Sequence, residues 1–243
     1  MEPKPTYLDW QFWTAVTSII AIILSQIPPL RVFFKKKMLT VEKHGLITLS
    51  HRIGSPTMGI FLILQNEGGR TINVKSIELN VVKDKRESFK LVGKGYFKES
   101  SDTNSTLLTP FSINVGESWR HSVFFYEDWS RKKQTEYRKL ESAVRDHIQA
   151  QSLGSEKLHE AKPEDVQSLI NIFERSFKWE PAEYEVQLKV LGDQGDLIAQ
   201  DSFNFVLFDS DSEELASYHK QYKYGDGVYY YSNKLPGVSI DIS

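Results

Sequence analysis

The chain has 243 residues with 30 basic and 32 acidic side chains, a formal net charge of −2 at neutral pH, and 40% hydrophobic residues. This balance argues against a nucleic-acid-binding protein, which would carry a surplus or a stripe of basic residues. The sequence has no cysteine, which excludes disulfides, thiol nucleophiles and thiolate metal sites.

The first feature along the chain is an uncharged apolar stretch from Phe12 to Leu30. A bilayer core about 30 Å thick requires roughly 20 mostly apolar residues in a helix. The stretch reaches this length if the helix begins near Leu8, so it predicts a single transmembrane helix. A cleaved signal peptide fits less well, because the leading region carries two acidic residues and no small-residue cleavage site follows. A buried core helix of this length would usually show a polar face.

Basic residues follow the apolar stretch at once: Arg31, Lys35, Lys36 and Lys37. The segment before the stretch contains only Lys4. Because basic residues are retained on the cytoplasmic side, we expect a cell (inner) membrane protein with its N-terminus outside and a cytoplasmic C-terminal domain. Residues 1–37 are thus the predicted anchor. The basic cluster is also suited to contact anionic lipid head groups.

One face of the predicted helix carries small side chains at helical spacing: Thr14, Ser18, Ala21 and Ser25. Small residues let two membrane helices approach closely, and hydroxyl groups can bond across the contact. The stripe predicts self-association through this face. In the alternative interpretation, the hydroxyl groups bond back to carbonyls of their own helix.

Residues 38–243 form the second predicted domain, and strand patterns dominate it. Met58–Leu64 is a continuous apolar run, typical of a strand covered on both faces. Apolar and polar residues alternate on both sides of the loop Leu191–Asp196, which predicts a hairpin. A change of parity between Val74 and Ile77 predicts a β-bulge. The remaining expected strands are Leu39–Lys43, Leu46–His51, Phe89–Phe97, Thr106–Phe111 and Ser118–Tyr126.

Two helices are expected to interrupt the strands, within residues 128–178. Trp129–Gln151 and Pro163–Phe177 both carry apolar residues at helical spacing. A shorter helix is expected from about Asp211 to Tyr222. About eight short strands with glycine-containing turns predict a mainly β (α+β) domain, an Ig-like antiparallel β-sandwich with an inserted helical pair.

The segment Tyr222–Tyr231 contains five tyrosines. Tyrosine offers a large contact area with few rotatable bonds, which suits an interface. The residues that we assign to a possible partner surface are Tyr224, Tyr229, Tyr230 and Tyr231. The alternative is a final strand at the edge of the sandwich, continued by the alternation of Val238, Ile240 and Ile242.

Recognisable catalytic motifs are absent from the sequence. It contains no phosphate-binding loop, dinucleotide fingerprint or nucleophile elbow. The six histidines lack the paired spacing of a zinc site. The acidic run Asp209–Glu214 has the alternation of a calcium loop but lacks its glycine, and a helix N-terminus explains the charges better. We therefore predict no catalytic residue, cofactor, metal site or small-molecule substrate.

The sequence favours a non-enzymatic, single-pass membrane protein. Its cytoplasmic β-sandwich would bind a protein partner or a second copy, in tethering, scaffolding or sensing at the bilayer. A second hypothesis is a membrane-perturbing effector that oligomerises through its transmembrane helix. The third is an enzyme whose site has no recognisable motif.

Overall fold

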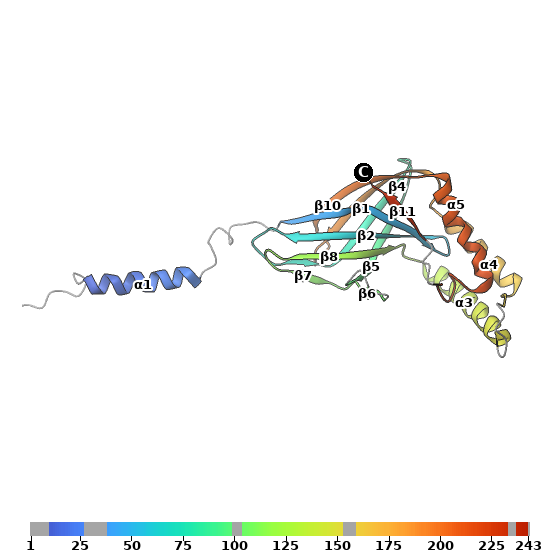
Figure 1. Cartoon of the computed structure of the whole chain (residues 1–243), viewed down its shortest axis with the longest axis horizontal. Coiled ribbons are helices and arrows are strands. Elements are labelled where there is room, and N and C mark those ends of the chain that lie inside the picture. Colours follow the sequence, from blue (N-terminus) through green and yellow to red (C-terminus); the bar gives the residue numbers. More distant parts are fainter. Residues whose placement is uncertain (1–9, 27–37, 99–103, 153–158, 233–236, 243) are drawn as a thin grey trace, which may run out of the picture.

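The computed structural model describes residues 10–26, 38–98, 104–152, 159–232 and 237–242. It shows an α+β protein in which an antiparallel sheet curls into a half-barrel, with the helices of residues 131–224 gathered at one end of the sheet (Figure 1). The predicted α+β class and antiparallel strands are confirmed. The Ig-like pair of stacked sheets is not found, because one continuous sheet curls around the core.

The strands of the main sheet follow the order β10-β9-β4-β5-β8-β2-β1-β11, and the short β6 pairs with β5. Their bounds are β1 Leu39–Arg52, β2 Ser55–Asn66, β4 Ser76–Lys83, β5 Glu87–Phe97, β6 Thr106–Leu107, β8 Ser118–Tyr126, β9 Ala182–Leu191, β10 Leu197–Leu207 and β11 Val238–Asp241. The two predicted strands Leu39–Lys43 and Leu46–His51 are one strand, β1, with an irregular register between Lys43 and Ile47.

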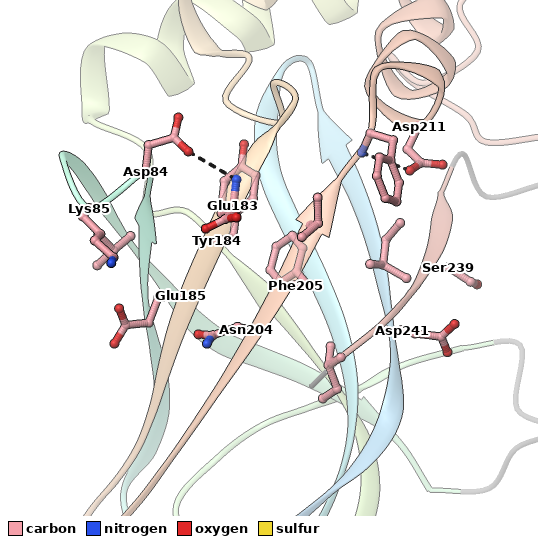
Figure 2. Close-up of a pocket in the computed structure, with 15 residues that line it drawn as sticks. Asp84, Lys85, Glu183, Tyr184, Glu185, Asn204, Phe205, Asp211, Ser239 and Asp241 are labelled. Carbon is pink, nitrogen blue, oxygen red and sulfur yellow. Dashed lines mark hydrogen bonds between the residues drawn. The ribbon is translucent and has the colours of Figure 1, made fainter.

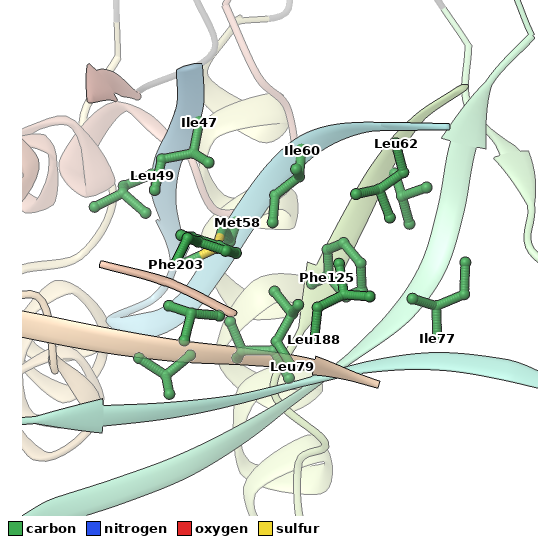
Figure 3. Packing of buried hydrophobic residues seen from close by; sticks show 14 of the residues in the cluster. Ile47, Leu49, Met58, Ile60, Leu62, Ile77, Leu79, Phe125, Leu188 and Phe203 are labelled. Atoms are coloured by element: carbon green, nitrogen blue, oxygen red, sulfur yellow. The ribbon is translucent and has the colours of Figure 1, made fainter. Parts of the chain in front are cut away.

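The curl of the sheet follows from the side chains on its inner face. Aliphatic residues such as Leu62, Leu79 and Leu188 come from different strands, and each has no exposed surface. Figure 3 shows these side chains pointing into one common core. Burial of each such side chain contributes about 1.5–3 kcal/mol. An alternating strand specifies one buried face, but it does not specify whether a second sheet or the same sheet covers that face. Here the twisted sheet covers its own inner face.

The change of parity after Val74 marks a change of sheet, and the predicted bulge is wrong. β3 (Ile72–Val74) pairs with β7 (Phe111–Ile113) in a separate two-stranded sheet. The chain then enters the main sheet as β4, and the Lys75 amide donates to the Leu191 carbonyl at 2.8 Å. Val74 of β3 and Ile77 of β4 are both fully buried. The change of parity therefore lets β3 and β4 bury apolar side chains in the same core.

The predicted helical pair is present. It follows β8 and precedes β9 in the chain, as α3 (Arg131–Ser152) and α4 (Pro163–Ser176). The third predicted helix is divided into α5 (Asp209–Ser217) and the 3₁₀ helix η2 (Tyr218–Tyr224). These helices bury a second apolar cluster, which includes Tyr137, Val144 and Leu169. The tip of the β1–β2 hairpin enters the same cluster through Ile53, which is 1% exposed.

The first helix, α1 (Trp10–Gln26), has 17 residues. At 1.5 Å per residue it is about 26 Å long, which is shorter than a bilayer core of about 30 Å. Among the described residues, no helix has the length and apolarity needed to cross a membrane. The predicted transmembrane helix is therefore not supported, and its expected start near Leu8 and the end of the apolar stretch at Leu30 lie outside the described residues.

Candidate functional site

The two end strands of the main sheet, β10 and β11, approach each other where the half-barrel nearly closes. In the described part of the chain, β10 pairs with β9 alone and β11 pairs with β1 alone. The junction, which we call the seam, is bridged by Lys43 of β1 and Asp201 of β10 at 2.6 Å. The Lys43 ammonium also lies 5.6 Å from the centre of the Phe203 ring. Side chains therefore join β10 to β1, where no backbone ladder is present among the described residues.

A groove of about 880 Å³ lies along the seam beyond the Lys43–Asp201 bridge. We call it the seam groove. Figure 2 shows its two walls, with Glu185 and Asn204 on one side and Ser239 and Asp241 of β11 on the other. The start of α5, marked by Asp211, closes the end of the groove near the helices. A volume of this size is within the range of ligand-binding clefts.

Two stacked aromatic rings give the groove a rigid floor. The Tyr184 and Phe205 rings lie 4.8 Å apart and are nearly parallel, at 6°. Both side chains are almost fully buried. The Tyr184 hydroxyl lies 2.9 Å and 2.8 Å from the carbonyl oxygens of Lys178 and Glu180. Burial raises the pKa of Tyr184, so its hydroxyl stays protonated at neutral pH and serves a structural role.

Carboxylates outnumber cations around the seam groove, since Lys85 is the one basic side chain that the described residues contribute to its lining. The acidic residues of the lining are Asp84, Glu183, Glu185, Asp211 and Asp241. Asp84 accepts a hydrogen bond from the Glu183 amide at 3.2 Å, and Asp211 accepts one from the Phe208 amide at 3.3 Å. The other three carboxylates are exposed and form no ion pair among the described residues. The groove therefore presents a negative surface.

The outer face of β10 exposes apolar surface at the same place. Val206 is 43% exposed, and Phe208, directly after the strand, is 65% exposed. Both line the seam groove. The outward positions of a strand at a water-facing surface are usually polar. The groove thus combines exposed apolar side chains with carboxylates that have no ion-pair partner in the described part of the chain.

The tyrosines of the predicted partner surface lie in the 3₁₀ helix and the turns that precede β11. Tyr229 and Tyr231 line a second cavity of about 590 Å³, which we call the tyrosine cavity. Tyr230 is 39% exposed and packs edge-to-face on Tyr229 at 5.1 Å. Tyr224 lies apart from that cavity, and the Lys223 ammonium is 4.6 Å from its ring. These residues form turns and a 3₁₀ helix, so the alternative of a strand through Tyr231 is wrong, whereas the edge strand after it is present as β11.

Arg52 is a cationic side chain in the lining of the tyrosine cavity. Its guanidinium carbon lies 4.9 Å from the centres of both the Trp129 and the Tyr137 rings. Glu141 lies in the same lining, so the cavity holds both signs of charge. Burial is the main cause that raises the pKa of Tyr137 to about 12, against the opposing effect of Arg52. Arg52 therefore stacks on neutral rings, which is a favourable packing arrangement.

The small-residue stripe of α1 uses its hydroxyl groups within its own helix. Thr14 donates to the Trp10 carbonyl at 2.9 Å, Ser18 to the Thr14 carbonyl at 2.7 Å and Ser25 to the Ile22 carbonyl at 2.7 Å. Back-bonding of this kind is the alternative that the sequence left open. Self-association through the stripe stays a prediction. The basic cluster Arg31–Lys37 lies outside the described residues.

Lys133 is the most enzyme-like group of the described residues. Its ammonium donates to the hydroxyl oxygens of Ser55 at 2.5 Å and Ser176 at 2.7 Å. Burial lowers its pKa, and nearby Lys178 adds to the effect. Ser55 also accepts a hydrogen bond from the Trp129 indole at 2.6 Å and is 2% exposed. The cluster therefore joins α3 to β2 and α4 as a buried structural network. No group of three metal-binding side chains occurs among the described residues.

Sequence reasoning did not find the seam groove, because its walls come from turns and strands far apart in the chain. One local signal was available. Phe203, Phe205 and Leu207 face the core. Val206 and Phe208 occupy the alternate positions, which face away from the core, and yet both are apolar. An apolar residue at the outward parity of a strand indicates exposed apolar surface or a contact that the strand alone does not explain.

No protein-family model and no curated protein matches the chain. Among solved structures, the YcdA protein of Bacillus subtilis is similar at 12% identity, with a TM-score of 0.32, over 76% of this chain and 42% of that chain. The ApaA protein of Bordetella pertussis is similar at 10% identity and a TM-score of 0.26, over 69% of this chain and 94% of that one. The sporulation control protein Spo0M of B. subtilis shows 11% identity and a TM-score of 0.26, over 70% and 49%. With TM-scores this low, the likenesses carry no argument about fold or function.

Proposed function

We propose that this protein is a non-enzymatic binding protein that captures an extended segment of a partner protein in the seam groove. One observation supports this function, the groove of about 880 Å³ at the junction of β10 and β11. Clefts of this size are typical binding sites, and exposed apolar side chains that gather on one surface indicate a contact with a partner. Val206 and Phe208 supply apolar surface that such a segment would cover.

Site-specific photo-crosslinking in cells that express the full chain tests this function. A benzoylphenylalanine is placed at Phe208 in the groove, at Phe61 on the outer face of β2 and at Tyr230. Phe61 is 37% exposed and is a matched control for an aromatic side chain on the sheet surface. We expect a discrete protein adduct from position 208 and none from position 61. An adduct from Tyr230 alone would assign the partner surface to the tyrosines, and equal adducts at all three positions would contradict a specific groove.

We also propose that α1 attaches the domain to lipid, with the basic cluster Arg31–Lys37 at the water interface and the β-domain on the cytoplasmic side. The support is the exposure of large apolar side chains on α1, including Trp10 at 83%, Ile22 at 62% and Leu24 at 59%. Exposed apolar surface of this extent marks a contact with another apolar phase. The back-bonded hydroxyl groups of Thr14 and Ser18 lower the cost of placing this helix in lipid.

Flotation of the full chain with anionic vesicles tests the lipid attachment. Substitution of Ile20→Glu together with Ile23→Glu places two charges on exposed apolar positions of α1 and should abolish flotation, because each charge costs about 2.5 kcal/mol or more in an apolar helix environment. Gln167→Glu with Gln221→Glu adds the same charge at exposed positions of the domain and should leave flotation unchanged. Loss of flotation in both variants would show a charge effect unrelated to α1.

A further inference from the structure

A third cavity lies between the tip of the β1–β2 hairpin and the start of α3, and it shares no lining residue with the seam groove. Its volume is about 370 Å³, and its lining includes Arg52, Tyr126, Trp129, Tyr137 and Arg138. We call it the arginine pocket. We infer that this pocket binds a small phosphate monoester, whose phosphate dianion lies between the guanidinium groups of Arg52 and Arg138. The site is independent of partner capture in the seam groove.

The charges of the lining leave two cations without a carboxylate partner. Its acidic residues each pair with a lysine, in the ion pairs Glu127–Lys178 and Asp128–Lys94. Arg52 and Arg138 form no ion pair with any residue in the described part of the chain. Glu141, in the lining of the tyrosine cavity, accepts a hydrogen bond from the Tyr137 hydroxyl at 3.3 Å. The pocket therefore holds two guanidinium charges that a phosphate monoester, with about −1.5 to −2 at neutral pH, would balance.

Aromatic rings hold the guanidinium of Arg52 in place. Its central carbon lies 4.9 Å from the centres of both the Trp129 and the Tyr137 rings. The Trp129 ring is fixed in turn, because its indole donates to the Ser55 hydroxyl oxygen at 2.6 Å. A guanidinium has five N–H donors, and stacking on ring faces uses none of them. Arg52 is therefore pre-oriented by packing, with donors left for the oxygens of an anion, and phosphate suits the fork of a guanidinium.

The start of α3 adds positive potential to the pocket. The helix has 22 residues, and its first turn contains no acidic residue. The N-terminal end of a helix carries a partial positive charge, which favours anions nearby. Lys133, in this first turn, places its ammonium 5.0 Å from the centre of the Trp129 ring. Arg138 lies further along the same helix and is exposed, so its guanidinium is accessible to a ligand.

The Tyr126 ring provides a wall for the organic part of the ligand. It is 36% exposed and lies in the same lining as both arginines. Burial raises the pKa of Tyr126, so its hydroxyl is neutral at physiological pH and does not repel an anion. A cavity of this volume is at the small end of ligand-binding clefts and is larger than a phosphate ion requires. A phosphate attached to a small ring therefore fits better than inorganic phosphate or an extended chain.

Calorimetric titration of the full chain in mild detergent at neutral pH tests the inference. The probe is phenyl phosphate. Phenyl sulfate has the same ring with a single negative charge, and inorganic phosphate lacks the ring. We expect phenyl phosphate to bind, and the other two anions to bind at least about tenfold more weakly. Equal affinity for phenyl sulfate would overturn the assignment to a dianion, and equal affinity for inorganic phosphate would overturn the assignment to a monoester.

Variants of α3 separate the pocket from a general effect of net charge. Arg138→Gln should weaken phenyl phosphate binding about tenfold or more, because a charged donor is lost. Arg138→Lys keeps the charge but loses the paired N–H groups, and its affinity should lie between the two. Arg131→Gln is the matched control, since it removes the same charge from an exposed position of the same helix outside the lining. Equal weakening in Arg131→Gln and Arg138→Gln would overturn the inference.

Two further measurements complete the test. Arg52→Lys should also weaken binding, and thermal unfolding of each variant shows whether the fold is kept. An eight-residue peptide that contains phosphotyrosine carries the same aryl phosphate on a protein segment. We expect it to bind no more tightly than phenyl phosphate. Binding of the peptide tenfold tighter would assign the pocket to a phosphorylated protein and overturn the small-molecule inference.

Discussion

His51 is a buried histidine that holds the end of β1 against the helices. Its Nε2 lies 2.8 Å from the Leu215 carbonyl oxygen, and the Gly54 amide donates to its Nδ1 at 3.2 Å. This arrangement assigns the proton of the neutral ring to Nε2 and leaves Nδ1 as an acceptor. Burial lowers the pKa of His51 from 6.5 to about 4, and the nearby His219 acts in the same direction. A second proton, which would be on Nδ1, would face the N–H of Gly54, so two donors would point at each other.

The lowered pKa makes stability depend on pH. Because the folded-state pKa lies below the unfolded value, the contribution of the neutral ring is complete above pH 6.5 and is lost as the pH falls toward 4. Between pH 7.5 and 4.5, the free energy of unfolding should fall about 2–3 kcal/mol further in the wild type than in His51→Gln. Urea unfolding at the two pH values measures this difference. An equal fall in both proteins would show that other groups, such as carboxylates, account for the acid sensitivity.

At the scale of elements, the β1–β2 hairpin is the joint between the sheet and the helices. Ile53 and Gly54 at its tip have φ of 46° and 80°. A β-branched residue is uncommon at positive φ, and Ile53 is held there by its burial in the helical cluster. Gly54 lies so close to α4 that a Cβ would stand 2.4 Å from the Phe173 carbonyl oxygen. The contact therefore requires glycine for two reasons, conformation and space.

Gly54→Ala should destabilise the protein by about 2–4 kcal/mol, since it adds a steric overlap to the strain of positive φ. The matched control is Gly195→Ala, where φ is also 80° but nothing lies within 4 Å of the new Cβ. That variant should cost only about 1–2 kcal/mol. Thermal and urea unfolding of both variants provide the measurement. Equal losses would mean that α4 moves away to accept the methyl group.

Most elements could be predicted from local patterns, because periodicity depends on the strand or helix itself. The alternation of residues 183–190 predicted β9, and apolar residues at helical spacing predicted α4 within one residue of its end at Ser176. The path of the sheet could not be predicted this way. Val74 and Ile77 belong to different sheets, yet locally the parity change is indistinguishable from a bulge.

The candidate site was beyond the reach of sequence patterns for a related reason. Asp84, Glu185 and Asp241 are far apart in the chain. They line the same groove because the curl of the sheet brings β4, β9 and β11 near one edge. Each residue alone resembles an ordinary solvated charge. Their joint effect depends on sheet order and closure, which are tertiary properties. The tyrosine-rich segment had a stronger local signal, but its residues are divided between a cavity and separate turns.

For the whole molecule, the half-barrel is an almost closed sheet whose junction depends on side chains. Backbone ladders join every neighbouring pair from β10 round to β11, but the seam is bridged by Lys43 and Asp201. These side chains are 20% and 29% exposed, so water screens the pair less than a surface ion pair. A junction without a backbone ladder should open at a lower free energy than the rest of the sheet. Opening at the seam would also widen the groove.

Lys43→Met should therefore loosen the seam selectively. It keeps most of the aliphatic stem but leaves the half-buried Asp201 carboxylate without its cation, which should cost about 1–2 kcal/mol. We expect amides of β10 and β11 to exchange hydrogen faster, while those of β4 and β5 keep wild-type protection. Lys90→Met is the control, because the Lys90–Glu78 pair at 2.7 Å lies on strands already joined by a ladder, and its effect should be within about 0.5 kcal/mol. Uniform acceleration across all strands in Lys43→Met would mean that the seam opens only with global unfolding, so the groove would be a fixed feature of the folded protein.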